Sequence, residues 1–413
     1  MYKSSYKWLV IFSVLVSSLF AQDVEEEGKQ EDPDMQALRT WIREKRMVTI
    51  REIGGDLSLS GEIRTEFQGF NEKKDGIQQR GRYSASQKPD YAFDVEVNVM
   101  LDYQNENAWG SVKIEYDNDM GVESGTADKL ALERAYLGAR LIDGETFNLD
   151  GEIGRRNISS VFDSRIQFSA LFDGAVLKFN KAFESIGNFY ANVGIFLVND
   201  LFDHYGEIAE IGMLKVGNTG FFLKYSFINW KKNYVNTAKD KIYDFGNSQL
   251  TLGYQGTVSR WNKYIKIYLA GLMNHFADNL KLSDKTYNSK YNLGAYFGIS
   301  YGRILKRGDW AVDTNIQYVM PQAVPDYDSA GIKRGNADKI GLFTQKFDGT
   351  GPLTSSTSAV GSGNFKGFQF EILYAVSNNL TLLQNFEISN NQTKEVGPYM
   401  TYKKYEMELI YAF

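Results

Sequence analysis

Apolar and polar residues alternate one by one from residue 56 almost to the end of the chain. In the first segment Leu57, Leu59 and Ile63 share one parity, while Glu62 and Arg64 share the other. A period of two is the pattern of a β-strand with one apolar and one polar face. The pattern recurs along the chain, so the sequence predicts an all-β protein of about 16 antiparallel strands. The predicted strands lie near 56–67, 94–103, 108–116, 130–141, 147–155, 172–179, 188–198, 208–216, 221–229, 248–256, 264–274, 291–301, 310–320, 366–374, 380–388 and 402–413.

The connections between these segments alternate between long and short. A soluble sandwich also alternates along its strands, but it has no reason to sort its connections by length. Long external loops on one side and short periplasmic turns on the other are typical of a transmembrane barrel. We therefore predict an up-and-down transmembrane antiparallel β-barrel over 56–413. The clearest pairs are 70–92 against 104–107, 117–129 against 142–146, and 321–365 against 375–379.

Composition excludes several classes of site. The chain has no cysteine and only two histidines, His204 and His275, which excludes disulfide scaffolds, thiolate metal sites and histidine-rich zinc sites. We expect neither a cofactor nor a metal. All six prolines lie outside the predicted strands, as the hydrogen-bond ladder of a sheet requires. Four tryptophans at strand ends are predicted to join the aromatic girdles of a membrane barrel: Trp109, Trp230, Trp261 and Trp310.

Residues 1–21 have the features of a secretory signal peptide. Lys3 and Lys7 provide positive charge, residues 8–16 are apolar, and cleavage is expected near Ala21. The alternative is an uncleaved membrane anchor, for which the apolar segment is short. After residue 21 no apolar run reaches the roughly 20 residues that a membrane helix needs.

Residues 22–55 form a predicted acidic linker with a short periplasmic helix. Seven acids against one lysine lie in 23–34, so most of the net charge of −5 belongs to the linker and the barrel is nearly neutral. This balance suggests no nucleic-acid partner. Met35, Leu38 and Ile42 lie at helical spacing, which predicts a helix over 34–45. It is either a periplasmic spacer or a helix packed at the barrel mouth or in the lumen.

The last strand resembles the terminal strand of bacterial outer-membrane proteins. Tyr405, Met407, Leu409 and Tyr411 share one face, and the chain ends on Phe413. A final strand must pair with the first to remove the open edge of a barrel. The resemblance implies recognition by the barrel-assembly machinery and a location in the bacterial outer membrane, in contact with its lipid.

Residues 133–140 and 154–156 resemble the bacterial general porins, a family of 16-stranded barrels. In that family a strand opening with arginine and an aromatic residue precedes a strand ending in Gly-Arg, and then a loop that folds into the lumen. Residues 162–168 lie in the corresponding connection, between the fifth and sixth strands. The resemblance implies diffusion of small hydrophilic solutes and a homotrimer, although the family's Pro-Glu-Phe-Gly-Gly signature is absent.

The parity of the strands predicts which side chains line the lumen. Charges on every second residue indicate a wet interior, because unpaired charges in a packed core are very costly. We expect Arg134, Arg140 and Arg156 to face Glu62, Glu66 and Asp163 near the narrowest point. The alternative is that these are ordinary solvated charges, paired for stability. The full predicted constriction comprises Glu62, Arg64, Glu66, Arg134, Tyr136, Arg140, Glu152, Arg156, Asp163 and Arg165.

The favoured function is passive diffusion of ions and small hydrophilic solutes through a water-filled, charge-lined pore. One alternative is a substrate-selective channel for sugars, peptides or carboxylates, supported by Tyr264, Tyr268 and Tyr296 on inward parity. Another is a surface adhesin or binding protein that uses the barrel as an anchor, although a barrel this wide is not expected to be packed solid. We expect no enzymatic activity, because no nucleophile-elbow pattern accompanies the two histidines.

Overall fold

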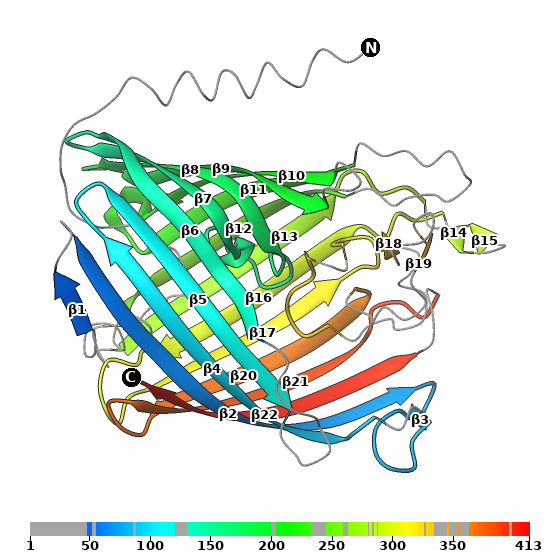
Figure 1. Ribbon diagram of the computed structural model, residues 1–413. Helices are drawn as coiled ribbons and strands as arrows, with labels where there is room; N and C mark the ends of the chain where they lie inside the picture. Colours follow the sequence, from blue (N-terminus) through cyan, green and yellow to red (C-terminus); the bar gives the residue numbers. More distant parts are fainter. Residues whose placement is uncertain are drawn as a thin grey trace.

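The computed structural model is a closed antiparallel β-barrel of sixteen strands. Each strand pairs with its neighbours in chain order, and Figure 1 shows them tilted steeply across the wall. The structure describes residues 48–51, 55–85, 88–119, 130–199, 204–232, 245–258, 263–279, 281–282, 285–286, 288–325, 328–333, 345–346, 354–355, 363–395 and 399–413. The predicted signal peptide and the helix over 34–45 lie outside these residues.

All sixteen predicted strands are confirmed, with ends that differ by a few residues. The barrel strands are β2 (Asp56–Lys74), β4 (Tyr91–Gln104), β5 (Ala108–Asp119), β6 (Leu130–Asp143), β7 (Phe147–Asn157), β8 (Leu171–Phe183), β9 (Gly187–Asn199), β10 (His204–Leu214), β11 (Phe221–Lys232), β12 (Gly246–Val258), β13 (Lys263–Asn274), β16 (Leu293–Gly302), β17 (Trp310–Val319), β20 (Phe365–Ala375), β21 (Leu380–Asn391) and β22 (Met400–Ala412). The largest shift is in β2, which continues to Lys74 because it pairs with β22 as far as Met400.

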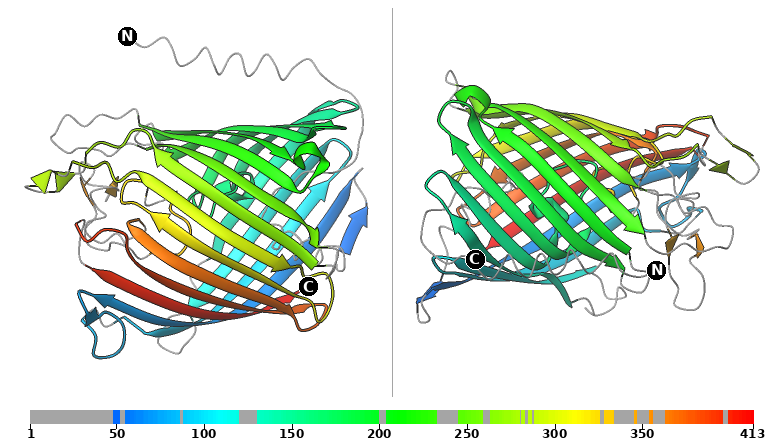
Figure 2. Two further views of the ribbon diagram at one scale, coloured as in Figure 1. Left: turned by 180° about the vertical axis from the view of Figure 1, so that it is seen from behind. Right: turned by 90° about the horizontal axis from the view of Figure 1, so that it is seen from above.

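Short elements surround the barrel. They are the strands β1 (Val48–Arg51), β3 (Ile77–Gln78), β14 (Lys281–Leu282), β15 (Lys285–Thr286), β18 (Gln345–Lys346) and β19 (Thr354–Ser355), with the 3-10 turns η1 (Ile158–Ser160) and η2 (Val216–Asn218). In Figure 2 the extensions that carry β14, β15, β18 and β19 gather at one end of the barrel, and the C-terminus lies at the other. Among the described residues, no helix is long and apolar enough to cross a membrane.

The barrel closes where the last strand meets the first. β22 pairs antiparallel with β2 from Met400 to Ala412, and the backbones of Gly61 and Phe413 exchange hydrogen bonds of 2.9 and 3.0 Å. Gly61 is required there, because an added Cβ would lie 2.5 Å from the Phe413 ring. β1 then pairs with the start of β2, where β22 has ended. The predicted closure by the C-terminal strand is thereby confirmed.

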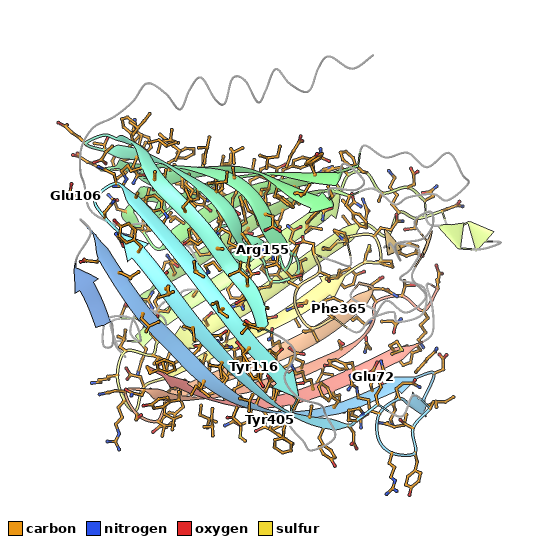
Figure 3. The ribbon with its side chains drawn as sticks, viewed as in Figure 1. Glu72, Glu106, Tyr116, Arg155, Phe365 and Tyr405 are labelled. Carbon is orange, nitrogen blue, oxygen red and sulfur yellow. The ribbon has the colours of Figure 1, made fainter. Side chains whose placement is uncertain are left out.

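The outer face is apolar, as the alternation predicts. Leu130, Leu137 and Ile153 are 73, 62 and 56% exposed, which is costly in water and favourable against lipid tails. Tyr405 lies between Phe67 and Phe386 on this face, with ring centroids 6.4 and 4.7 Å away (Figure 3). The apolar outer face of the described barrel is therefore suited to contact with membrane lipid.

The tryptophan prediction is only partly correct. Trp310 is 40% exposed on the outer face beside Tyr301, as a girdle residue should be. Trp230 is instead buried inside the barrel against Phe196, and Trp109 donates from Nε1 to the inward carboxylate of Glu152. Position at a strand end does not decide the face, because parity sends these two side chains inward. Trp261 lies outside the described residues.

Candidate pore and its constriction

The connection between β7 and β8, residues 158–170, folds into the barrel, and we call it the inner loop. It begins with η1, and its Ile158, Phe162 and Phe168 are completely buried. They pack on inward side chains of β8 to β11, which include Phe196 and Trp230. An apolar cluster thus fixes the loop to one side of the lumen, because these rings leave water when the loop docks. The inward fold of this loop, implied by the resemblance to porins, is confirmed.

Polar contacts hold the inner loop to the same side of the barrel. Ser164 donates from Oγ to Gln249 Oε1 at 2.7 Å, and Gln249 Nε2 donates to the Asp163 carbonyl at 3.1 Å. Farther along the wall, Arg165 Nη2 donates to Asp313 Oδ2 at 3.1 Å. The anchors belong to β12 and β17, so the loop spans part of the lumen.

Asp163 and Lys224 form the ion pair at the centre of this anchorage. Lys224 Nζ donates to Asp163 Oδ2 at 2.9 Å, and the lysine side chain is only 3% exposed. Burial alone would raise the pKa of the Asp163 carboxyl, but Lys224, Lys266 and Arg165 together hold this pKa below its usual value. The carboxylate is therefore ionised throughout the physiological range.

The predicted basic residues lie on the inner face of β6 and β7, but their partners differ from those expected. Arg140 pairs with Asp150 at 3.0 Å on the adjacent strand. Arg156 pairs with Glu152 on its own strand and stacks over Tyr136, 4.4 Å from the ring centroid. The same strand or the adjacent one supplies a carboxylate within reach of Arg140 and of Arg156, so these arginines do not need to span the lumen. Their position at the constriction stays a prediction.

Other residues of the predicted constriction also have charged neighbours, on an adjacent strand or across the contact between the inner loop and the wall. Lys178 Nζ lies 2.8 Å from Glu152, which thus serves two cations. Arg134 lies opposite Lys113 in the register of β5 and β6. Asp163, expected opposite the arginines, instead pairs with Lys224, a residue that strand parity placed inward but that the sequence analysis did not single out. We call the inner face of β6 to β17, with the inner loop on it, the covered wall.

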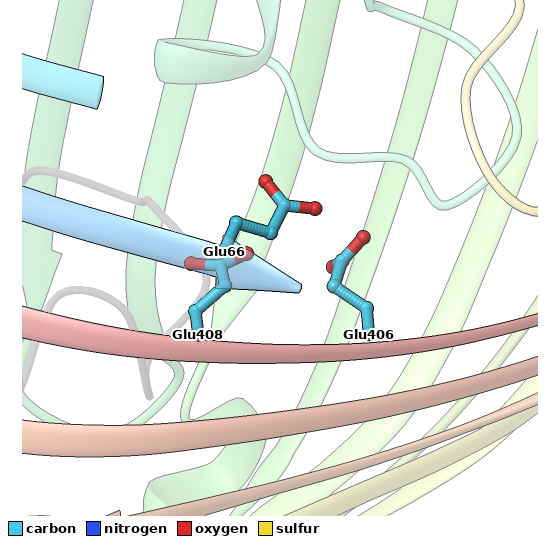
Figure 4. A group of neighbouring side chains, drawn as sticks. All are labelled: Glu66, Glu406 and Glu408. Atoms are coloured by element: carbon cyan, nitrogen blue, oxygen red, sulfur yellow. The ribbon is translucent and has the colours of Figure 1, made fainter. Parts of the chain in front are cut away.

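The inner face of β20, β21, β22, β2, β4 and β5 forms the remainder of the lumen, and we call it the bare wall. Arg64 on β2 lies 2.6 Å from Glu62 and 3.9 Å from both Glu96 and Glu408. Glu66 lies on the same strand beside Glu408 of β22 in the pairing register. Figure 4 shows Glu66 and Glu408 reaching from the two strands toward the interior. The structure brings Glu62, Arg64 and Glu66 together, apart from the predicted arginines of β6 and β7.

No protein-family model matches the sequence, and no curated protein matches it either. Among solved structures, the high-pH structure of OprB from Pseudomonas putida is similar, with a TM-score of 0.50 and 11% identity over 94% of this chain and 100% of that one. OmpF from Salmonella typhi, in complex with daunomycin, has a TM-score of 0.50 and 12% identity over 89% of this chain and 100% of that one. The chain has the porin fold.

A second segment enters this porin-type barrel, and the sequence analysis missed it. Residues 320–325 and 328–333 follow β17 and cover the inner loop: Ala330 donates its N–H to the Ile166 carbonyl at 3.1 Å. Ile332 donates to Gln317 Oε1 at 3.1 Å and is 3% exposed. We call these residues the second inner segment. The signal available was apolar Ala323 and Val324 between two prolines, in a loop treated as wholly external.

Asp328 joins the two inward elements of this porin fold. Its carboxylate accepts the N–H groups of Phe168 and Ala170 at 3.1 and 3.2 Å, and Ser169 donates to the Ser329 carbonyl at 2.9 Å. Asp328 is completely buried. Burial raises its pKa from 3.8 to about 7, although the backbone donors and Lys333 favour the charged form. The carboxyl therefore titrates near neutrality.

The three inward tyrosines are occupied by wall contacts. Tyr264 lies under the guanidinium of Arg303, whose Cζ is 3.4 Å from the ring centroid. Tyr268 donates to Asp313 at 3.0 Å, and Tyr296 accepts from Gln249 Nε2 at 3.3 Å. The inward parity is as predicted. The Tyr268 and Tyr296 hydroxyls bind residues that also anchor the inner loop, and the Tyr264 hydroxyl donates to Gln255, which weakens the case for an aromatic track.

The two histidines give no further support to an enzyme. His275 Nε2 lies 2.6 Å from Ser248 Oγ in an exposed position, and its ring is 6.3 Å from that of Phe227. Ser248 has the parity of the outer face, away from the lumen. The side chain of His204 is outside the described part of the structure. The expectation that the protein is not an enzyme stays a prediction.

Proposed function

We propose that the protein is an outer-membrane porin through which ions and small hydrophilic solutes diffuse passively. The observation that carries this proposal is the asymmetric filling of the barrel. The inner loop packs on the covered wall, and the second inner segment reaches from it to Ser389 of β21, while polar and charged side chains line the rest of the bare wall. Glu96 and Glu115 on the bare wall keep 24% of their side-chain surface exposed, although they point into the barrel. Water can reach this wall, as a diffusion pore requires.

The passage needs no cofactor, covalent step or energy source. A solute moves down its concentration gradient between the bare wall and the inner loop, and the width there limits its size. Charged side chains exchange hydrogen bonds and hydration with the solute. The fixed anchors of the inner loop, such as Ser164 on Gln249, keep this width constant.

We further propose export by a signal peptide cleaved near Ala21 and insertion by the barrel-assembly machinery through the C-terminal strand. The pairing of Phe413 with Gly61 supports the second point, because insertion must end with that seam closed. A homotrimer is proposed on the resemblance of the sequence to general porins.

Planar-bilayer recording on the purified, refolded protein tests the porin proposal. We expect stepwise openings of uniform size, and liposomes containing the protein should swell in small sugars and not in large ones. The matched control is the same protein after heat denaturation, which should give no steps. Folded protein without steps would overturn the proposal and favour a surface-binding role. Saturation of flux by one solute class would favour the substrate-selective channel.

A further inference from the structure

Acidic side chains far outnumber basic ones on the bare wall. The strand register assigns each charged residue to one face, since partners across the ladder share it. Among the side chains that the structure describes, the inward bases are Arg64, Lys74, Lys113 and Lys404. The inward acids are Asp56, Glu62, Glu66, Glu72, Asp94, Glu96, Asp102, Glu115, Asp117, Glu371, Glu387, Glu406 and Glu408. The near-neutral charge of the whole barrel therefore conceals a strongly acidic surface.

Two bases of this wall, Arg64 and Lys113, are each shared among carboxylates. Arg64 lies within 3.9 Å of Glu62, Glu96 and Glu408. Lys113 bridges Glu115, at 3.0 Å, and Glu133 of the neighbouring β6. Pairing of this kind leaves a negative excess, because one cation cannot neutralise two or three anions.

The covered wall differs from the bare wall in how its charges are paired. Several of its cations are held in ion pairs with acids of the same wall or of the inner loop: Lys224 with Asp163 at 2.9 Å and Arg165 with Asp313 at 3.1 Å. Arg156 is also paired and only 7% exposed. A buried, paired cation contributes little field to the lumen, since its partner cancels most of its charge at a distance.

The negative charge is densest where β2 meets β22. Glu66, Glu406 and Glu408 each bring a carboxylate oxygen within 4.8 Å of the others. Figure 4 shows all three carboxylates on the interior side of these strands. Lys404 pairs with Glu406 there, so the cluster keeps a net negative charge. Like charges held this close raise the local concentration of counter-ions.

We propose that the pore selects cations over anions, and that the bare wall, with Glu66, Glu406 and Glu408 at its densest point, determines this selectivity. The inference rests on the proposed function, because it needs an open pore. The field of the bare wall draws cations along β2 and β22 and repels anions, while the paired charges of the covered wall do not offset it. The cations pass through a diffuse field, without a resident metal ion.

The test is the reversal potential of single channels in a roughly tenfold KCl gradient, with the dilute side near 0.1 M so that screening acts over about 10 Å. We expect wild-type protein to prefer potassium to chloride by about threefold or more, because surface potentials of several kT are usual in charged clefts. The triple variant Glu66→Gln, Glu406→Gln and Glu408→Gln should lose at least about half of this preference. Unchanged step frequency would show that it folds and conducts.

A matched control removes three carboxylates from the turns that connect β4 to β5, β6 to β7 and β8 to β9. Glu106, Glu145 and Glu184 are exposed there, and their triple change to glutamine should leave the reversal potential almost unaltered. A second variant, Lys404→Gln, should raise the preference for potassium. Steps with no ion preference, or with a preference for chloride, would overturn the inference and leave the porin proposal standing. Absence of steps in folded wild-type protein would instead overturn the porin proposal.

Discussion

The covered wall and the bare wall belong to one sheet and obey one alternation, yet they differ in packing and charge. On the covered wall Phe162, Phe168 and Trp230 form an apolar cluster inside the barrel, and Lys224 is buried in an ion pair with Asp163. On the bare wall Arg64 is surrounded by three carboxylates and no loop anchor is seen among the described contacts of 158–170. Because both walls share the same strand alternation, the difference shows that the docked loops, more than the strands, determine which part of the lumen stays in contact with water.

The comparison also explains why buried aromatic residues can occur on inward parity. Phe196 and Trp230 would be misplaced in a water-filled barrel, but the inner loop removes them from solvent. Glu66 and Glu408 lie outside that apolar cluster, and their carboxylates point toward the lumen (Figure 4). An inward apolar residue therefore indicates a docked loop, whereas an inward acid can be buried too, as Glu152 and Asp313 are beside their paired cations.

The largest effect is expected from the apolar anchor of the covered wall. Phe162→Ala removes a completely buried ring and should cost about 3–5 kcal/mol of loop docking. The loop would detach for part of the time, so single-channel currents should become larger and noisier. Leu137→Ala on the outer face, where the side chain is 62% exposed, is the control and should conduct like wild type. An unaltered current in Phe162→Ala would contradict docking on the covered wall.

Loss of the central ion pair should have the next largest effect. Lys224→Met leaves Asp163 near Lys266 and Arg165 but without its closest partner, at a cost of up to about 3 kcal/mol. Current noise should increase, and the preference for potassium should rise as a cation is lost. The double variant with Asp163→Asn should recover steady currents. A double variant as noisy as the single one would show that the pair does not hold the loop.

Docking of the inner loop should depend on pH through Asp328. Its pKa is raised to about 7 in the docked state, so the docked state holds its proton more tightly than the released one, whose pKa is near 3.8. The resulting stabilisation is complete below about pH 4 and is lost as pH rises through about 7. Current noise should therefore increase from pH 5 to pH 8. Asp328→Asn should flatten this dependence, and a variant with the wild-type profile would assign it to another group.

The smallest effect is expected from the outer face, which belongs to neither wall of the lumen. Arg155 donates from Nε and Nη2 to Asp173 at 2.7 and 2.8 Å, and both side chains are 41% exposed. Arg155 and Asp173 lie two residues from the ends of β7 and β8, where the wall meets the membrane surface, so Arg155→Ala should change the stability by less than about 1 kcal/mol, because solvated pairs contribute little. Heat-induced unfolding on gels and the reversal potential should both match wild type. A changed reversal potential would mean that the assignment of faces is incorrect.

The sequence alone was sufficient to predict the sixteen strands and the side chains that point inward. An apolar and polar alternation that is repeated sixteen times fits few folds other than a barrel. The sequence was also sufficient to place Glu62, Arg64 and Glu66 together, since they share one parity of one strand. It could not pair Asp163 with Lys224 or Asp328 with Phe168, which are far apart in the chain and meet only after a loop has folded inward. The girdle prediction for Trp230 was wrong for another reason: it rested on position at a strand end, whereas parity sends this side chain inward.

The contrast between the two walls is tested most directly by cysteine accessibility, and the chain has no native cysteine to interfere. Glu96→Cys places a thiol on the bare wall, and Thr251→Cys places one on the covered wall, where the side chain is 3% exposed beside Gln249. A charged methanethiosulfonate reagent is added during single-channel recording. We predict a stepwise reduction of current in Glu96→Cys and no change in Thr251→Cys. A reduction in Thr251→Cys with none in Glu96→Cys would contradict the account.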